Sequence, residues 1–292
     1  IATVDEAYQA LPGDLFYPAK RAVEKTQVAM AQAFGDQKSE TKLHSEFAKR
    51  RASETKRLMK GNDPQKNAKA TRTLSDLKQE LKNVDKKLAV SGAVTADVAK
   101  EVKQNTEEIK DTLKQVKDDM AVESADKVLA QEVSDVKDAA KVTELKAVET
   151  MVTQHLQGDN SVTKEEVKQM ISTTLDNVVV EAASNKQNAD DANKVVEAVK
   201  VEVKDMAKNA VAGVAISSST KDLAVKINVM ATETKDASAK ADVIVKEMDK
   251  QVTEAKVLLS TGDLTEALNK VREATATSQK VEAITDQTIA SV

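Results

Sequence analysis

Hydrophobic positions recur every three or four residues along most of this chain, which is the spacing of amphipathic helices. Single glycines interrupt the pattern where an apolar stripe ends. Glycine readily takes the left-handed conformation that ends a helix, so these positions mark the expected boundaries. The pattern predicts an all-α fold with helices at about 18–34, 36–60, 64–91, 95–157, 161–213, 219–260 and 263–290.

The first three segments fit a compact bundle. The segment 36–60 carries Leu43, Phe47 and Leu58 on one face, and the charged residues Arg51 and Glu54 fall on the same stripe. The segment 64–91 repeats apolar residues at the spacing of a buried helix face, at Leu74, Leu77, Leu81, Val84 and Leu88. With the segment 18–34, these two predict a small three-helix head at the N-terminus.

The later segments are longer, and their apolar stripes are narrower. In the segment 95–157 the stripe slips between Ala121 and Lys127, where we expect a kink or a break. The middle of the segment 161–213, from Glu181 to Lys194, offers only alanine to a core. It is either an alanine-packed seam or a weak hinge, and the absence of Gly and Pro favours the seam. These segments predict an elongated antiparallel bundle of long helices.

Two turns between the segments have recognisable patterns. Thr163 and Glu166 fit a capping box, in which each side chain accepts a hydrogen bond from the other residue's backbone amide. The same stretch, 158–166, is only loosely similar to a calcium loop, because it lacks the alternating oxygen ligands and the central glycine. The stretch 258–268 has the spacing of a tight antiparallel helical hairpin.

Composition divides the chain into two parts. All five aromatic residues lie within the first 47 positions: Tyr8, Phe16, Tyr17, Phe34 and Phe47. Residues 1–92 carry 18 Lys and Arg against 12 Asp and Glu, and residues 93–292 carry 26 against 36. We therefore expect two domains: residues 1–92 as a basic helical head with an aromatic plug, and residues 93–292 as an acidic, aromatic-free long-helix bundle. The basic part has no interleaved aromatic residues, so nucleic acid is not an expected partner.

Few residues in this chain point to chemistry. The absence of cysteine excludes disulfides, thiol catalysis and cysteine metal sites. His44, four residues after Glu40, is interpreted as a surface or interface histidine in preference to a metal ligand, and His155 as a cation at a helix C-terminus. The chain has no glycine-rich phosphate loop and no nucleophile elbow. We therefore expect no catalytic residues, no metal, no cofactor and no small-molecule substrate, so that the protein is not an enzyme.

The stretch from Leu11 to Lys25 concentrates aromatic residues and holds two of the three prolines. Its residues Leu15, Phe16 and Tyr17 allow two interpretations. They cap the open end of the first bundle, with Pro12-Gly13-Asp14 as a turn, or they form a docking knob for a protein partner. These three residues are the candidate protein-binding residues.

Two segments carry a resemblance to a known family. Residues 10–24 read Ala-Leu-Pro-Gly-Asp-Leu-Phe-Tyr-Pro-Ala-Lys-Arg-Ala-Val-Glu, and residues 43–51 read Leu-His-Ser-Glu-Phe-Ala-Lys-Arg-Arg. They resemble the opening of a bacterial domain-of-unknown-function family of exported helical proteins, over residues 10–91. The resemblance implies a helical domain placed just after a signal or membrane anchor, on the outer side of the cytoplasmic membrane. It implies no catalytic residues.

These observations lead to a functional hypothesis. We expect a bacterial, extracytoplasmic protein (periplasmic, secreted or at the cell surface) that acts as a spacer and protein-interaction module. The alternative is an extracytoplasmic stress sensor or a chaperone-like binder of peptide or metal. We expect a protein partner or self-association, with membrane contact only through an upstream anchor. The chain begins with Ile1 and not with Met, which is compatible with such an upstream segment.

Overall fold

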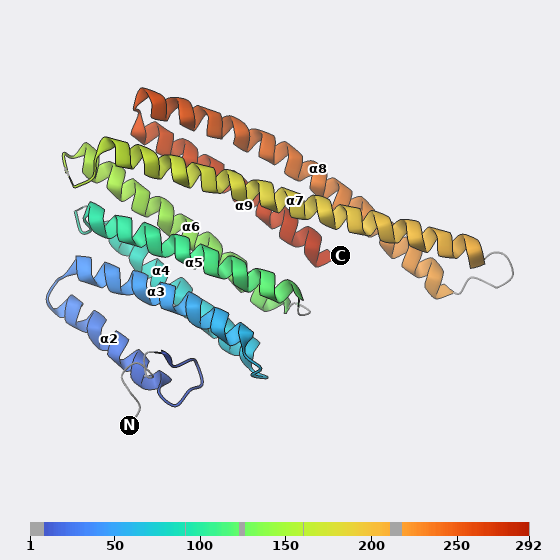
Figure 1. The fold of residues 1–292 in the computed structure, drawn as a ribbon, viewed down its shortest axis with the longest axis horizontal. Coiled ribbons are helices and arrows are strands. Elements are labelled where there is room, and N and C mark those ends of the chain that lie inside the picture. The colour runs from blue at the N-terminus through green and yellow to red at the C-terminus, as the bar shows by residue number, and fades with distance from the viewer. Residues whose placement is uncertain (1–8, 91, 123–125, 160, 211–217, 292) are drawn as a thin grey trace. The chain divides into compact units, whose positions relative to one another are not determined.

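The computed structural model describes residues 9–90, 92–122, 126–159, 161–210 and 218–291. Within these ranges the chain is all-α, as the sequence predicts, and contains no strand. Figure 1 shows the helices in chain order. Their bounds are α2 Tyr17–Ala33, α3 Gln37–Lys60, α4 Lys66–Leu88, α5 Ala96–Val122, α6 Lys127–Leu156, α7 Lys164–Ala210, α8 Ser218–Thr261 and α9 Leu264–Ser291.

The expected break in the segment 95–157 is present. Helix α5 ends at Val122 and α6 begins at Lys127. The Asp126 side chain caps α6 by accepting hydrogen bonds from the backbone amides of Val128 and Leu129, at 3.0 and 3.3 Å. The cap starts a new helix after the break. The chain reverses there, and α5 and α6 pack against each other. Two other sequence features, Tyr8 and the predicted stop at Gly213, lie outside the described residues.

The helices form two compact units, Ile1–Val167 and Lys168–Val292. In the first unit α3 contacts α4 and α5, and α6 contacts α4 and α5, so these four helices form a bundle with α4 and α5 on one diagonal. Helix α2 makes its main packing contact with α3. The bundle core is fully buried leucine, isoleucine and valine, including Leu74, Leu77, Ile109, Leu113, Leu129 and Val133.

The division at residue 167 differs from the sequence-based division at residue 92. The change in aromatic content and charge at residue 92 does not coincide with a gap in the packing. Helices α5 and α6 supply Ile109, Leu113 and Val133 to the same core as Leu74 and Leu77 of α4. A continuous hydrophobic core defines a compact unit better than composition does.

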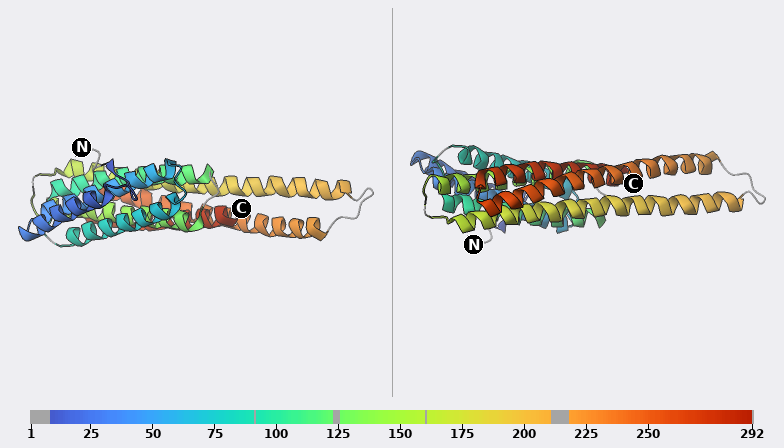
Figure 2. Two further views of the ribbon diagram at one scale, coloured as in Figure 1. Left: turned by 90° about the horizontal axis from the view of Figure 1, so that it is seen from below. Right: turned by 90° about the horizontal axis from the view of Figure 1, so that it is seen from above.

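The second unit contains the remainder of α7 with α8 and α9, and Figure 2 shows α8 and α9 running side by side. The middle of α7 is an alanine seam, as predicted, and not a hinge. Ala182 and Ala189 are fully buried on a continuous helix. Close approach at this seam is confirmed by Thr285, whose hydroxyl donates to the backbone carbonyl of Asn185 at 2.9 Å.

Both predicted turn patterns are confirmed. The amide of Thr163 donates to the Glu166 carboxylate at 2.8 Å, and the amide of Glu166 donates to the Thr163 hydroxyl at 3.2 Å. Between α8 and α9, Gly262 has a φ of +87°, and the amide of Asp263 donates to the carbonyl of Leu258 at 3.0 Å. This is the Schellman arrangement, which requires the left-handed conformation that glycine adopts without strain.

Candidate functional site

The residues Leu15, Phe16 and Tyr17 are positioned by a tight turn just before α2. The backbone amide of Leu11 donates to the Asp14 carboxylate at 2.7 Å, and the amide of Asp14 donates back to the carbonyl of Leu11 at 2.9 Å. Gly13 sits between them with a φ of +103°. Pro18 then occupies the first turn of α2, where its missing amide proton is not needed. The local sequence therefore fixes where α2 starts, and with it the positions of Leu15, Phe16 and Tyr17.

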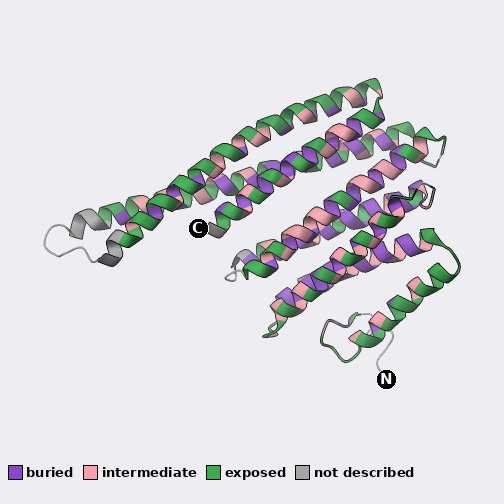
Figure 3. Cartoon of the chain, turned by 180° about the vertical axis from the view of Figure 1, so that it is seen from behind, coloured by how far each residue is buried: buried purple, intermediate pink, exposed green. Residues whose placement is uncertain are grey.

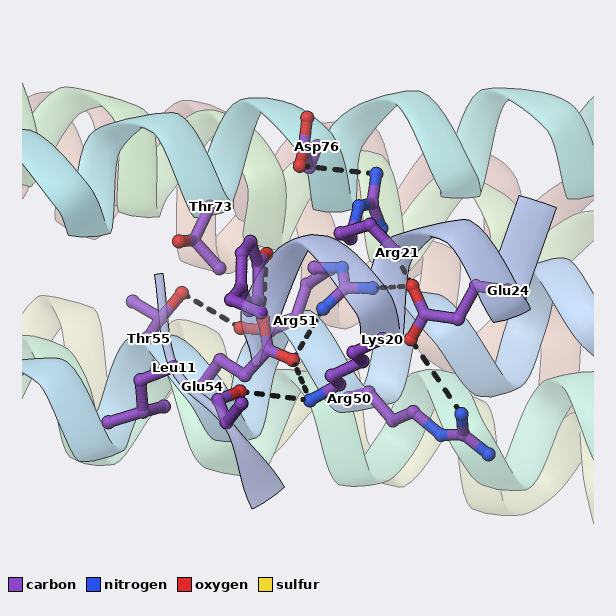
Figure 4. A network of polar contacts seen from close by, with 12 residues as sticks. Leu11, Lys20, Arg21, Glu24, Arg50, Arg51, Glu54, Thr55, Thr73 and Asp76 are labelled. Atoms are coloured by element: carbon purple, nitrogen blue, oxygen red, sulfur yellow. Dashed lines mark hydrogen bonds and ion pairs between the residues drawn. The ribbon is translucent and has the colours of Figure 1, made fainter. Parts of the chain in front are cut away.

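Helix α2 turns two of its charged residues toward the bundle. Lys20 and Glu24 are both buried against α3, and burial of such residues is rare unless they are paired. Figure 4 shows their partners. The Lys20 ammonium donates to Glu54 of α3 at 2.5 Å and to the backbone carbonyl of Ala10 at 3.2 Å. One lysine thus ties the start of the chain, α2 and α3 together.

Arg51 of α3 is the centre of this cluster, and its side chain is 0% exposed. Its guanidinium donates one hydrogen bond to Glu54 and another to Glu24. Glu24 is also paired with two arginines nearer the surface, Arg21 at 2.9 Å and Arg50 at 3.7 Å. We call these buried residues, Lys20, Glu24, Arg51 and Glu54, the ionic cluster.

The electrostatics of the ionic cluster favour its charged state. Burial lowers the pKa of Arg51, but the neighbouring Glu54 and Glu24 carboxylates outweigh it, so the pKa lies above the ordinary value. Tyr17 closes one side of the cluster, with its hydroxyl 3.3 Å from Glu54. Burial, and then the negative charge of Glu54, raise the pKa of the Tyr17 phenol to about 12. These shifts are typical of a structural ion-pair network.

A second polar group joins α2, α3 and α4. His44 lies 2.6 Å from the Glu80 carboxylate through Nδ1 and 3.8 Å from Glu40 through Nε2. Gln32 and Lys87 both donate to Glu40, at 2.8 and 2.6 Å. Burial favours the protonated carboxyl, but these two donors outweigh it and hold the pKa of Glu40 below its ordinary value. His44 is therefore an interface histidine, in agreement with the sequence interpretation.

Beside its buried side, α2 carries an apolar stripe that is exposed to solvent (Figure 3 colours exposed residues green). Phe16, Val23 and Met30 are 42%, 44% and 56% exposed and recur every seven residues. Leu15 and Phe34 extend the stripe at its two ends, at 86% and 81% exposure. The exposed residues of the stripe between them are small, namely Ala19, Ala22, Thr26, Ala29 and Ala33. We call these residues together the α2 stripe.

The arrangement of α2 is the reverse of an ordinary surface helix. An ordinary surface helix buries its apolar face and exposes its charges, whereas α2 buries Lys20 and Glu24 and exposes the α2 stripe. Lys25 is the one charged residue among the exposed residues of α2, a helix that the structure describes throughout. In other proteins, large exposed apolar surfaces are often sites of interaction.

The three sequence-predicted site residues have different positions. Leu15 and Phe16 lie on the exposed side, at the start of the α2 stripe, whereas Tyr17 is half-buried beside the ionic cluster. Sequence reasoning missed Val23, Met30 and Phe34, although the seven-residue spacing of Phe16, Val23 and Met30 is visible in the sequence. It also missed the ionic cluster, for which the signal was Arg51 and Glu54 on an otherwise apolar stripe.

The second histidine of the chain contacts the backbone. His155 lies at the end of α6, and its Nδ1 is 3.0 Å from the backbone carbonyl of Val162. Among the described residues, no group of three or more His, Asp or Glu side chains is arranged to hold a metal ion. None of the helices described here is both long and apolar enough to cross a membrane.

Comparison with known proteins gives one match, over part of the chain. Neither a curated protein nor a solved structure matches significantly. No enzyme family is among the findings. Residues 9–123 match a family described as "Domain of unknown function (DUF5667)", a segment that begins before the Leu11–Asp14 turn and runs through α2, α3, α4 and α5.

Proposed function

We propose that this chain is a non-enzymatic helical spacer and protein-interaction module that works outside the bacterial cytoplasm. The observation that carries the proposal is the α2 stripe, an exposed apolar helix face on a helix whose charged side is fixed inside the first unit. Exposing these side chains to water costs free energy, on the order of 1.5–3 kcal/mol for each large one that a partner would bury. A partner that covers the stripe recovers this free energy.

The ionic cluster supports an interaction role for α2 and no chemical one. Each ionised group of the cluster faces an opposite charge within 4 Å, as Lys20 faces Glu54 and Arg51 faces Glu24. Groups whose charges are paired in this way hold a helix in position, whereas catalytic acids and bases need a substrate within hydrogen-bonding reach. A helix held rigidly in the free protein loses less entropy when it binds.

The long helices support the spacer role. Helix α7 has 47 residues and α8 has 44, which correspond to lengths of about 65–70 Å at 1.5 Å per residue. Their packing uses small residues such as Ala182 and Ala241, both fully buried. Such narrow seams bring helices close together and leave little room for a ligand between them. The extracytoplasmic location is supported by the resemblance of residues 10–24 and 43–51 to exported helical proteins.

Site-specific photo-cross-linking in cells of the natural host tests the interaction role. A photoreactive amino acid replaces Val23 in the full chain, and a matched variant carries it at Val243, an exposed valine of α8. We expect discrete protein adducts from position 23 and none of the same mass from position 243. Cell fractionation of the same samples measures the compartment. The absence of any protein adduct at position 23 would count against the interaction role, and a cytoplasmic fraction would count against the proposed location.

The second candidate is an extracytoplasmic stress sensor or chaperone-like binder of peptide or metal. The same uncharged α2 stripe favours it, because unfolded chains bind exposed apolar surfaces. A ligand that binds only the native state raises the apparent Tm. A rise in Tm with an unfolded apolar peptide or with Zn²⁺ would support this candidate, and an unchanged Tm at saturating concentrations would oppose it.

A further inference from the structure

We propose that the α2 stripe pairs with the α2 stripe of a second copy of this chain, in an antiparallel arrangement. The inference rests on the proposed interaction role and names its partner. Phe16, Val23 and Met30 occupy one position of a seven-residue repeat, and Ala19, Thr26 and Ala33 occupy another, three residues later. This a and d pattern is the one by which a helix packs along a second helix.

The order of large and small residues selects the antiparallel arrangement. With a two-fold axis midway between Glu24 and Lys25, the repeat places Phe16 opposite Ala33, Ala19 opposite Met30 and Val23 opposite Thr26. Each layer then joins a larger and a smaller side chain, which is how facing helix positions fill space evenly. A parallel pair would instead place Phe16 on Phe16 and Ala19 on Ala19, so that thick layers alternate with voids.

A second copy fits the chemistry of the stripe better than a lipid surface does. A helix that lies in a membrane interface carries many lysines and arginines beside its apolar face, whereas Lys25 is the one charged residue among the exposed residues of α2. Lys25 lies two positions beyond the a residue Val23, on the side away from the proposed contact. The Thr26 hydroxyl already donates to the carbonyl of Ala22 at 2.9 Å, so its burial leaves no unsatisfied donor. Antiparallel α2 dipoles also attract each other.

The exposed area of the α2 stripe is of the size that a specific dimer uses. Counting all of its exposed surface, the α2 stripe offers at most roughly 600–900 Å² of mainly apolar surface per copy, against about 800 Å² buried per partner in a standard interface. The contact is isologous, because the same residues act on both sides of the two-fold axis, and this symmetry is the commonest among oligomers. The ionic cluster pre-organises both faces, since it fixes α2 on α3 before the copies meet.

Sedimentation equilibrium of the purified full chain tests the pairing. We expect the mass to rise from monomer to dimer with concentration. The double variant Val23→Glu/Met30→Glu places charges in the contact and is expected to weaken dimerisation by at least tenfold. Val243→Glu, at an exposed valine of α8, is the matched control and should dimerise like the parent. Circular dichroism and Tm verify that each variant is folded.

Single cysteines test the orientation, because the natural chain contains none. A mixture of Ala19→Cys and Met30→Cys chains should form a mixed disulfide, whereas Ala19→Cys alone should not link to itself. Self-linking of Ala19→Cys would overturn the antiparallel arrangement. A parent chain that stays monomeric at all concentrations, or a folded Val23→Glu/Met30→Glu chain that still dimerises, would overturn the second copy as the partner. Adducts to another protein from position 23 would then leave the proposed function standing.

Discussion

At the scale of single residues, Arg51 decides how α2 is held. Its side chain is completely enclosed, and it bonds to one carboxylate from α2 and one from its own helix. Replacing the whole cluster by apolar side chains of equal volume could be nearly neutral for stability. Removing a single partner is different, because the remaining buried charges lose part of their compensation. The cluster therefore acts as a set, and α2 depends on all of its members.

Arg51→Met is expected to destabilise the first unit strongly. The substitution leaves Glu24 and Glu54 buried without their common counter-ion, and losing one partner of such a buried group costs about 3–5 kcal/mol. Urea unfolding followed by circular dichroism measures the change. Arg72→Met is the matched control, because Arg72 is exposed on α4 and should change the free energy of unfolding by no more than about 0.5 kcal/mol. Equal effects of the two substitutions would refute a structural role for the cluster.

Tyr17 should ionise at a higher pH in the folded protein than in the unfolded chain. The chain has two tyrosines and no tryptophan, so absorbance near 295 nm reports phenol ionisation cleanly. Subtracting the titration of Tyr17→Phe isolates Tyr17, which should ionise near pH 12 in the folded chain and near pH 10 in guanidinium. Because the folded pKa is the higher one, this group's contribution to stability is complete below about pH 10 and is lost as the pH rises toward 12. A Tyr17 midpoint near 10 under native conditions would contradict the buried contact with Glu54.

At the scale of elements, helix positions were largely readable from the sequence, because glycine stops and capping residues act locally. Asp126 and the Thr163–Glu166 pair show this, since each cap involves residues within three positions. The inward side of α2 was not readable. The usual assumption is that the apolar stripe of a helix is buried. Here the buried side holds Glu24 and Arg51, which pair between two helices and lie 27 residues apart in the chain. Such a contact depends on the tertiary arrangement, so only Leu15 and Phe16 of the α2 stripe were identified in advance.

The turn between α8 and α9 should depend on Gly262. Its φ of +87° is a conformation that costs other residues roughly 1–2 kcal/mol. Gly262→Ala is therefore expected to lower the stability of the second unit by about that amount, as measured by thermal unfolding. Gly61 also follows a helix but has a φ of −79°, which alanine accepts. Gly61→Ala should have the smaller effect, and the opposite ranking would show that the turn does not control this hairpin.

At the scale of the whole molecule, the two units are built on different cores. The first unit buries large side chains such as Leu74, Leu77 and Ile109, whereas the seam of α7 in the second unit buries Ala182 and Ala189. Burial stabilises in proportion to apolar area, so a leucine contributes considerably more than an alanine. Each unit is internally packed, but the free energy needed to open a helix should differ between the two units. This difference follows from side-chain size alone and does not depend on where one unit lies relative to the other.

Hydrogen exchange should therefore show stronger protection of the amides in α4 and α5 than of those in the middle of α7. Local opening exposes few buried apolar atoms between Glu181 and Lys194, so amides there should exchange at least tenfold faster, relative to their intrinsic rates, than amides around Leu77 or Leu113. Peptide-resolved mass spectrometry measures both regions in one sample, and α9 around Val271 and Val281, which are fully buried, is an internal reference for the second unit. Equal protection in α7 and α4 would show that close alanine packing, with Thr285 bonded to the Asn185 carbonyl, stabilises a seam as well as leucine does. The predicted order instead makes the α7 seam easier to open locally than α4 and α5.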